Sequence, residues 1–426
     1  MSRLVIKNGR VIDPANNIDQ ITNVYISNGI IHSVGDTVEN FQADQTIDAT
    51  DHYVIPGIVD LSARLREPGL EYKADIASET VAATTAGITT LCIPPDTDPV
   101  IDEPAVVELI HRKVKNTGHA NVVALGALTA GLRGEHLSEM AALKSAGCVG
   151  LSNARFPVLN SLILRRAFEY AATHAMTVFI EADDHWLSNK GCAHEGAVST
   201  RLGLPPIPYS AETSSIAHYL ELIAETEVTA HFCRLSSARS VELINQAKNM
   251  GLKVTADVAA HQLHLTEMDI SSFNSQCHVL PPLRNQRDRD ALRTGIIHNI
   301  LSVICSDHQP HEIDAKQAPF PSTEPGISAL ETLLPLTLRL VHDGHLELNT
   351  AISKLTCEPA KILGINKGTL SQNSTADICI INPDTEWTLD ANKLNSRGKN
   401  TPFHGWNFNG KVSHTLMNGE IIYSDN

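Results

Sequence analysis

The sequence predicts an α/β protein: a (β/α)8 TIM barrel with a small composite β-sandwich domain built from both termini. Two observations lead to this fold class. In the middle of the chain, short apolar runs alternate with helical patterns eight times over roughly 300 residues, which matches the count and the size of such a barrel. The two ends are rich in strand patterns instead. We therefore place the composite β-sandwich domain at residues 1–52 and 366–426, and the barrel at residues 53–365.

The strand patterns at the two ends resemble each other. Near the start, residues 3–13 and 24–35 are apolar-rich runs that carry Asn-Gly turns at Asn8-Gly9 and Asn28-Gly29. Near the end, residues 377–389 and 410–426 are similar runs, with a further such turn at Asn418-Gly419. We expect the termini to build one domain that the barrel interrupts in sequence.

The barrel strands are predicted from eight apolar runs, most of them followed by a helical pattern. The runs are residues 54–61, 87–94, 121–128, 148–153, 176–182, 227–235, 252–260 and 301–307. A doubly wound open sheet is the rival architecture, but it usually carries a glycine-rich phosphate turn after its first strand, and this chain has none. The barrel is therefore favoured.

Composition excludes several classes of function. The chain has 426 residues and a net charge of -15, so it has no general electrostatic attraction to nucleic acid or to anionic membranes. No run of 18 apolar residues and no signal-peptide pattern is evident. The eight cysteines form no C-x-x-C pair, so we expect small buried thiols in a cytoplasmic protein. The 20 histidines, in contrast, suggest a metal hydrolase.

The residues that end the predicted strands are the candidate site, because barrel enzymes act at the carboxyl ends of their strands. Strand one ends at residues 60–69 and strand four at Asn153, while strand five ends at Glu181 to Asp184. Strand six ends at residues 231–234, strand seven near His261 and strand eight at residues 306–311.

These strand ends belong to blocks that resemble the dihydroorotase family of the amidohydrolase superfamily over essentially the whole chain. The blocks, in order, are residues 56–80, 194–208, 254–267, 281–292, 306–311, 325–336 and 399–406. The resemblance implies a (β/α)8 barrel that opens cyclic amides with bound metal. Colinear matches of this length are more specific than any single motif.

Most positions that the resemblance assigns to metal ligands carry other residues here. The former metal-ligand positions hold Ser62, Arg64, Asn153, Glu181 and Arg234, and only Asp307 keeps the expected residue type. Arginine has no lone pair to donate, and an amide is not an anionic bridge, whereas catalytic zinc needs about three protein ligands. We therefore expect a lost metal site, with no cofactor; zinc is expected only if the chain is active.

The pocket implied by the resemblance is altered as well. Arg66 stands where the family's arginine holds the substrate carboxylate; the alternative is a structural ion pair with Glu67 or a loop carboxylate. An asparagine position is taken by Asp96, which would repel an anion, and another by Leu280, which cannot form a hydrogen bond. The histidines that remain in this vestigial pocket are His231, His261, His308 and His311.

Together these departures predict a non-catalytic dihydroorotase homologue, a pseudoenzyme in which Asp307 is only a relic. The resemblance implies a cytoplasmic assembly partner of the aspartate transcarbamoylase catalytic subunit in de novo pyrimidine biosynthesis, and a homo-oligomer. Two alternatives stay open. One is an active dihydroorotase or other cyclic-amide hydrolase with a rebuilt or single-metal site. The other is a regulatory module that binds an anion through Arg66.

One expectation goes beyond the resemblance. Arg64 and Arg234 should point into the former metal site, with Glu181 and Asp307 beside them. Arginine pairs well with carboxylates through its planar fork of donors. We therefore predict a buried cluster of ion pairs at the barrel mouth.

Overall fold

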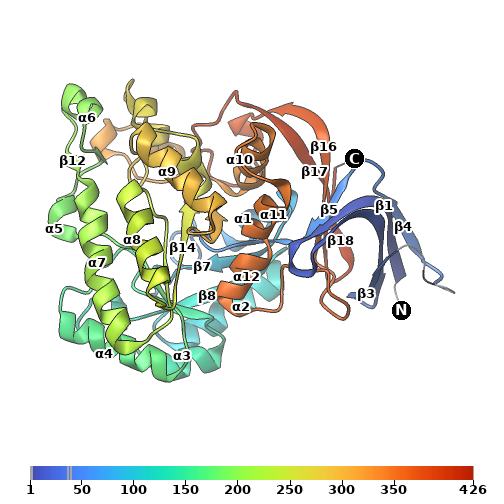
Figure 1. Ribbon diagram of the computed structural model, residues 1–426, viewed down its shortest axis with the longest axis horizontal. Helices are drawn as coiled ribbons and strands as arrows, with labels where there is room; N and C mark the ends of the chain where they lie inside the picture. The colour runs from blue at the N-terminus through green and yellow to red at the C-terminus, as the bar shows by residue number, and fades with distance from the viewer. Residues whose placement is uncertain (1–2, 36–37, 39–40, 426) are drawn as a thin grey trace.

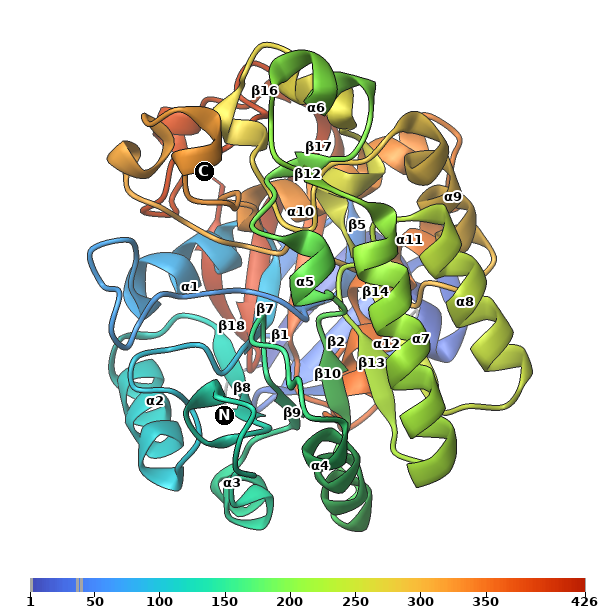
Figure 2. The same cartoon turned by 90° about the vertical axis from the view of Figure 1, so that its left-hand side faces the viewer.

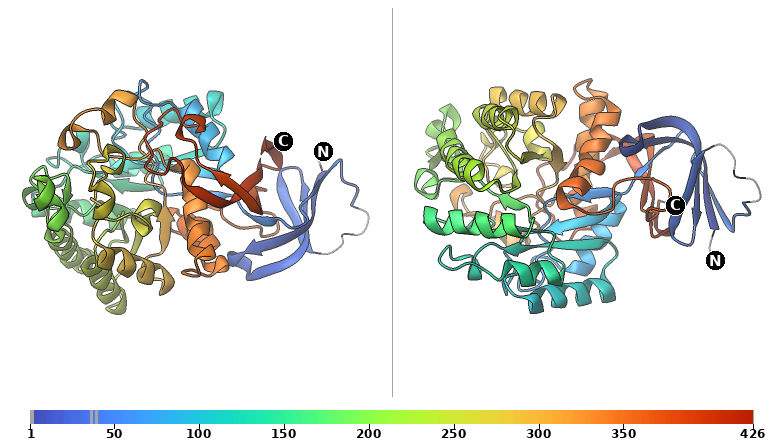
Figure 3. Two further views of the ribbon diagram at one scale, coloured as in Figure 1. Left: turned by 90° about the horizontal axis from the view of Figure 1, so that it is seen from above. Right: turned by 60° about the horizontal axis from the view of Figure 1, so that its bottom comes forward.

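The structure is a computed structural model that describes residues 3–35, 38 and 41–425. A barrel surrounded by helices forms one end of the molecule and a curled mixed sheet forms the other (Figure 1). The first and last described strands both lie in that sheet, which projects from the side of the barrel (Figure 3).

Strands from both ends of the chain form one eight-stranded sheet. Its order is β18-β17-β16-β5-β1-β2-β3, and β4 pairs with β1. The strands are β1 (Arg3–Asp13), β2 (Ile18–Ser27), β3 (Ile30–Gly35), β4 (Gln45–Asp48), β5 (Tyr53–Pro56), β16 (Ile378–Thr388), β17 (Asn407–Met417) and β18 (Glu420–Ser424). The two chain ends thus build one domain, and β5 joins them because it pairs with both β1 and β16.

Two of the three Asn-Gly pairs turn the chain as expected. Both residues have positive φ at Asn28-Gly29 and at Asn418-Gly419, which is the backbone that tight hairpins need. The prediction of a turn at Asn8-Gly9 is wrong, because β1 continues through this pair to Asp13. The register between β1 and β2 shifts there, so the extra length is a bulge. A side chain at Gly9 would also collide with Val54.

The barrel has the predicted eight parallel strands. They are β6 (Ile58–Asp60), β7 (Ile88–Ile93), β8 (Asn121–Ala127), β9 (Gly150–Ser152), β10 (Val178–Ile180), β13 (Ala230–Phe232), β14 (Val254–Ala259) and β15 (Val303–Cys305). Each lies within one of the eight predicted runs. The first run differs in one respect, because it divides at Gly57 between β5 of the outer sheet and β6 of the barrel. A bridge between Ala63 and His308 brings the two ends of the barrel sheet together.

Helices surround the barrel (Figure 2). The α-helices are α1 (Ile76–Thr85), α2 (Pro104–Thr117), α3 (Met140–Ala146), α4 (Ser161–Thr173), α5 (His185–Ser188), α6 (Ala197–Leu202), α7 (Tyr209–Thr226), α8 (Ala238–Asn249), α9 (Gln286–Ile297), α10 (Leu330–His342), α11 (Leu348–Leu355) and α12 (Cys357–Leu363). A pair of short strands, β11 (Ala193–His194) and β12 (Pro206–Ile207), lies beside α6. Short 3-10 helices span Pro14–Asn16, Ala130–Leu132, Ala260–Leu263, Glu267–Ile270, Ser275–Cys277, Ile313–Lys316, Phe320–Ser322 and Ala391–Lys393.

The local sequence explains why these helices begin where they do. Asp75 accepts a hydrogen bond from the backbone of Ser78, whose hydroxyl bonds back, so a capping box starts α1. Ser237 caps α8 in the same way through the backbone of Ser240. In the described part of the chain, no helix has the length and apolar character needed to cross a membrane. Six of the eight cysteines are buried thiols, as expected.

Candidate functional site

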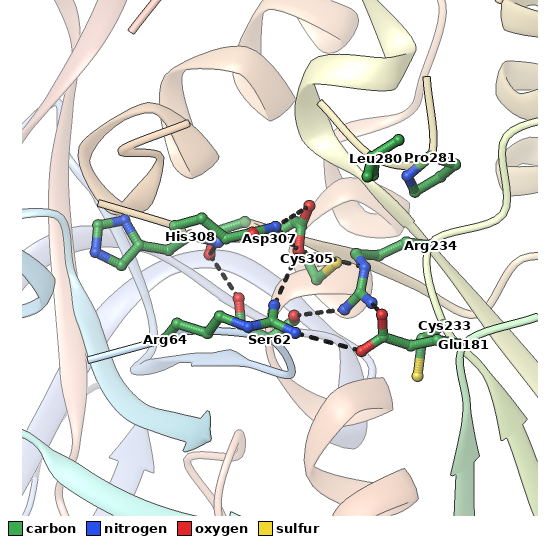
Figure 4. A network of polar contacts seen from close by, with 12 residues as sticks. Ser62, Arg64, Glu181, Cys233, Arg234, Leu280, Pro281, Cys305, Asp307 and His308 are labelled. Carbon is green, nitrogen blue, oxygen red and sulfur yellow. Dashed lines mark hydrogen bonds and ion pairs between the residues drawn. The ribbon is translucent and has the colours of Figure 1, made fainter. Parts of the chain in front are cut away.

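The predicted cluster of ion pairs is present at the barrel mouth, where four strand ends meet (Figure 4). Arg64 lies beyond β6, Glu181 follows β10, Arg234 lies beyond β13 and Asp307 lies beyond β15. Arg64 Nη2 lies 3.5 Å from Glu181 Oε1, and Arg234 Nε lies 3.3 Å from Asp307 Oδ1. Arg234 Nη2 also contacts Glu181 Oε2. The four side chains are at most 10% exposed, so this is a buried ionic network.

Two further charges complete this network, and sequence reasoning did not place them there. Asp96, beyond β7, accepts a hydrogen bond of 2.8 Å from Arg64 Nε. Arg155, beyond β9, donates to Glu181 Oε2 over 3.2 Å and to the Leu280 carbonyl. We call these six residues the central cluster: Arg64, Asp96, Arg155, Glu181, Arg234 and Asp307. The position of Arg155 just after a strand end was the signal that could have identified it.

The charges of the central cluster stabilise one another. Burial alone would raise the pKa of Glu181, but Arg234, Arg64 and Arg155 outweigh it and lower that pKa to about 2. Burial would lower the pKa of Arg234, but Glu181 and Asp307 raise it well above its ordinary value. Glu181 and Arg234 therefore stay charged at neutral pH.

The backbone at the barrel mouth is held in an uncommon conformation. Arg66, Arg234 and Asp307 all have positive φ, between 49° and 66°, a region that residues other than glycine rarely adopt. The three residues follow different strands, so the feature belongs to the mouth as a whole. Backbone of this kind tends to gather at functional sites.

Two of the predicted metal-ligand positions form hydrogen bonds within the protein. Ser62 Oγ accepts a hydrogen bond of 2.9 Å from Arg234 Nη1. Asn153 forms hydrogen bonds with neighbouring loop segments. Its Oδ1 accepts a hydrogen bond of 2.7 Å from Thr129 Oγ1, and its Nδ2 donates to the carbonyl groups of Leu132 and Phe156. Asn153 thereby holds the segment between β9 and α4.

This donor set does not fit the metal centre that the resemblance implies. Arg64 and Arg234 bring two cations to the place where divalent ions would lie, and a guanidinium cannot donate a lone pair. Glu181 and Asp307 are already bound to these cations. The oxygen of Asn153 is likewise occupied.

Another group of possible ligands lies deeper in the barrel, where His231, Cys233 and Asp257 come together within the described residues. His231 uses both ring nitrogens, contacting Thr255 Oγ1 at 2.8 Å and Asp257 Oδ2 at 2.9 Å. Burial and the nearby Asp257 raise the pKa of the Cys233 thiol well above its ordinary value, which opposes formation of the thiolate that binds metal. The group fits a hydrogen-bonded core pair better than a metal site.

The residues of the predicted vestigial pocket are dispersed. Arg66 Nε donates to the Pro310 carbonyl over 3.0 Å, and its Nη2 lies 3.1 Å from His311 Nε2. The alternative that Arg66 pairs with Glu67 is wrong, because Glu67 binds Lys113.

The other two histidines also differ from the expected pocket. His308 contacts α1, where its Nε2 lies 2.8 Å from Glu79 Oε2. His261 is buried, its Nδ1 has no hydrogen-bond partner among the described residues, and burial lowers its pKa to about 4.

An open pocket of about 220 Å³ borders the central cluster on the side of β10 and β13. Arg155, Glu181 and Arg234 contribute charged groups to its wall, and Leu280 and Pro281 contribute apolar groups. In the view of Figure 4, Arg234 lies between Glu181 and these two apolar residues. Its remaining lining residues are Ala182, Asp183, His185, Ser188, Lys190, Gly191, Ile207, Glu212, Cys233, Pro282 and Arg284. Charged groups that face an apolar wall are typical of small-molecule sites.

Comparison with known proteins places these residues in a family. A family model described as dihydro-orotase-like matches residues 51–240. Relatives from Pseudomonas putida and Pseudomonas aeruginosa, each named dihydroorotase-like protein, are 45% identical over 98% of this chain and 98% and 99% of their own lengths. A relative from Geobacter metallireducens named dihydroorotase is 41% identical over 99% of both chains.

A solved structure shows the same fold. The L-hydantoinase (dihydropyrimidinase) from Arthrobacter aurescens aligns with a TM-score of 0.90 at 22% identity, covering 100% of this chain and 96% of that one. The match confirms the barrel with its attached β domain as the fold class.

These relatives contradict the expectation that the chain is not an enzyme. That expectation rested on the altered metal-ligand positions and on the altered residues of the implied pocket. A relative named dihydroorotase from Syntrophotalea carbinolica also shares 41% of its residues over 99% of both chains. With the Geobacter relative and the hydantoinase-like fold, it points to an active hydrolase.

Proposed function

Because the chain belongs to the dihydroorotase-like family of the amidohydrolase superfamily, we propose that it hydrolyses the C–N bond of a cyclic amide at a rebuilt site in its barrel mouth. The observation that carries the proposal is the pocket beside Glu181 and Arg234, at the end of the barrel where such enzymes act.

The groups that border the pocket supply the parts of a hydrolytic step that needs no metal ligand. Asp183 accepts a hydrogen bond from Ser188, and burial raises its pKa, which makes its carboxylate a stronger base. In the proposed step, Asp183 takes a proton from water as the water oxygen bonds to the amide carbon. The C–N bond then breaks, and the proton passes to the leaving nitrogen. The positive charges of Arg155 and Arg234 in the pocket wall stabilise the oxyanion electrostatically.

The test is turnover of dihydroorotate and of hydantoin by the purified chain, with the metal content measured on the same sample. We expect Asp183→Asn to lower kcat/KM by about 100-fold or more, because general bases contribute on this scale. Asp307→Asn tests the other carboxylate near the centre, which is buried and bound to Arg234.

Asp184→Asn is the matched control. Asp184 caps α5 through the backbone of Trp186 and Leu187, a role that asparagine performs equally well. Its turnover should equal that of the unmodified chain. Absence of turnover on both cyclic amides would contradict the proposed function.

We also propose that the chain assembles with the catalytic subunit of aspartate transcarbamoylase. What supports this is a set of exposed apolar side chains on segments that follow β9 and β10. Phe156, Leu159, Leu162 and Trp186 are each more than half exposed, and aromatic side chains are enriched where proteins meet one another.

Assembly is tested by mixing the purified chain with that subunit and sizing the product by light scattering. A mixed complex that the combined Leu159→Ser and Trp186→Ser substitutions abolish is the expected result. Met250→Ser is the control, because Met250 is equally exposed but follows α8 at that helix's carboxyl end. A product that contains only copies of this chain would contradict the proposal.

A further inference from the structure

The pocket beside the central cluster contains charged groups that the protein leaves available and others that it fully engages. Glu181 contacts three guanidinium groups, so it has little capacity for a ligand. Glu212 accepts hydrogen bonds from the backbone and hydroxyl groups of Ser236 and Ser237, and it pairs with Arg284. These two carboxylates are therefore structural parts of the pocket wall.

Two cations that border the pocket remain available. Arg155 uses Nε and Nη2 within the protein, but its Nη1 has no hydrogen-bond partner among the described residues, and its side chain is 27% exposed. Lys190 also lines the pocket, and in the described part of the chain no hydrogen bond or ion pair engages its side chain. A ligand that brought a negative charge would satisfy both.

The pocket also offers an apolar wall and one acceptor. Leu280, Pro281 and Pro282 line one side and Ile207 lines another, so a flat ring could lie against them. Asp183 can accept a hydrogen bond from a ring N–H or O–H group. These features together describe a ring that carries one carboxylate and one hydrogen-bond donor.

Arg66, the residue that the family resemblance assigns to the substrate carboxylate, is engaged elsewhere. Its Nε is bound to the Pro310 carbonyl and its Nη2 to His311. It does not line the pocket. The Arg64 and Arg234 side chains are tied to Glu181 and Asp307.

We propose that carboxylate recognition in this chain has moved from Arg66 to Arg155, and that the pocket binds a ring monocarboxylate through Arg155 and Lys190. The inference rests on the proposed function, which places the substrate in this pocket. It adds the residue that determines specificity for an anionic ring. Arg155 Nη1, the guanidinium nitrogen that the protein leaves free, can donate a charge-assisted hydrogen bond to the carboxylate.

The test is calorimetric titration of the full chain with 4-hydroxybenzoate and with its neutral counterpart, 4-hydroxybenzamide. We expect the anion to bind at least about tenfold more tightly than the amide. Arg155→Gln should weaken binding of the anion by about tenfold or more, on the scale of a charge-assisted hydrogen bond. Arg66→Gln should leave binding within about twofold, because Arg66 does not line the pocket.

Two further variants keep the test decisive. Arg165→Gln removes an exposed arginine of α4 that pairs with Glu225, so it controls for loss of charge alone and should bind normally. Ala182→Leu fills the pocket and leaves Arg155 unchanged, so it should also weaken binding of the anion. This variant tests the site even where Arg155→Gln folds poorly.

The outcomes separate this inference from the proposed function. Binding of the anion that depends on Arg155, without turnover of any cyclic amide, would leave the inference standing and overturn the proposed function. Equal binding of acid and amide would overturn the inference, as would loss of binding in Arg66→Gln with normal binding in Arg155→Gln.

Discussion

Two groups of buried charge meet at the barrel mouth, and they are neutralised in different ways. The central cluster contains three guanidinium groups and three carboxylates that contact one another. The second group, which we call the loop cluster, consists of Arg66, Lys73, His311, Lys316 and Glu324. It has four basic side chains but only one carboxylate, and that carboxylate is 55% exposed.

In the loop cluster, backbone carbonyl groups and the loss of protons from basic side chains reduce the cost of buried positive charge. The central cluster relies on ion pairs instead. Lys316 Nζ donates to the carbonyl of Glu324 over 2.6 Å, and burial lowers its pKa to about 7. Burial, together with the charges of Arg66, Lys73 and Lys316, lowers the pKa of His311 to about 2. The comparison teaches that the central cluster depends on keeping every partner, whereas the loop cluster tolerates the loss of charge.

The largest effect is expected from breaking the central cluster. Glu181→Gln would leave three guanidinium groups to share Asp96 and Asp307. Removing one partner of a buried ionic network leaves uncompensated charge, so the free energy of unfolding should fall by about 3–5 kcal/mol. Urea denaturation monitored by circular dichroism would measure it.

A surface pair supplies the control for that experiment. Glu169 pairs with Arg165 on the exposed face of α4, so Glu169→Gln should cost less than about 1 kcal/mol. If both variants unfolded at the same urea concentration, the central cluster would not be an interdependent network.

The contrast between the clusters also separates what the sequence could predict from what it could not. All eight barrel strands were predictable, because each is a short apolar run that ends at polar residues. Arg64, Arg234, Glu181 and Asp307 were predictable as a group, because parallel strands bring their carboxyl ends together.

Other parts of the site depend on loop paths, which carry no periodic signal. Arg155 and Asp96 follow the ends of β9 and β7, which places them near the barrel mouth, but nothing in their spacing shows which way these segments turn and hence which partners they reach. The inactivity inferred from missing ligands was wrong for a related reason. The residue types at the former metal-ligand positions do not show which pocket forms beside those positions.

The next largest effect concerns the pH dependence of the loop cluster. The pKa of Lys316 falls from 10.5 to about 7 on folding, so between these values the unfolded chain binds more protons than the folded one. The free energy of unfolding should therefore rise with pH in this range, by at most about 1.4 kcal/mol per pH unit from this group. Lys316→Met should remove that contribution, as measured by urea denaturation at pH 7 and pH 9.

Lys253→Met is the matched control for this pH dependence. The Lys253 side chain is 60% exposed, so its variant should keep the pH slope of the unmodified chain. Identical slopes for Lys316→Met and the unmodified chain would show that Lys316 remains protonated in the folded state throughout this range.

The smallest effect is expected at Arg66, where the two clusters adjoin. No carboxylate lies within ion-pair distance of Arg66 in the part of the chain that the structure describes, so Arg66→Gln should change the free energy of unfolding by less than about 1 kcal/mol. It should nevertheless raise the pKa of His311 from about 2, because it removes one of the cations that oppose protonation of the ring. Histidine-selective NMR titration would measure this pKa, with His311→Gln identifying the signal. An unchanged His311 pKa would mean that burial alone keeps the ring neutral, and the loop cluster would then be a set of separate hydrogen bonds in which the charges do not act on one another.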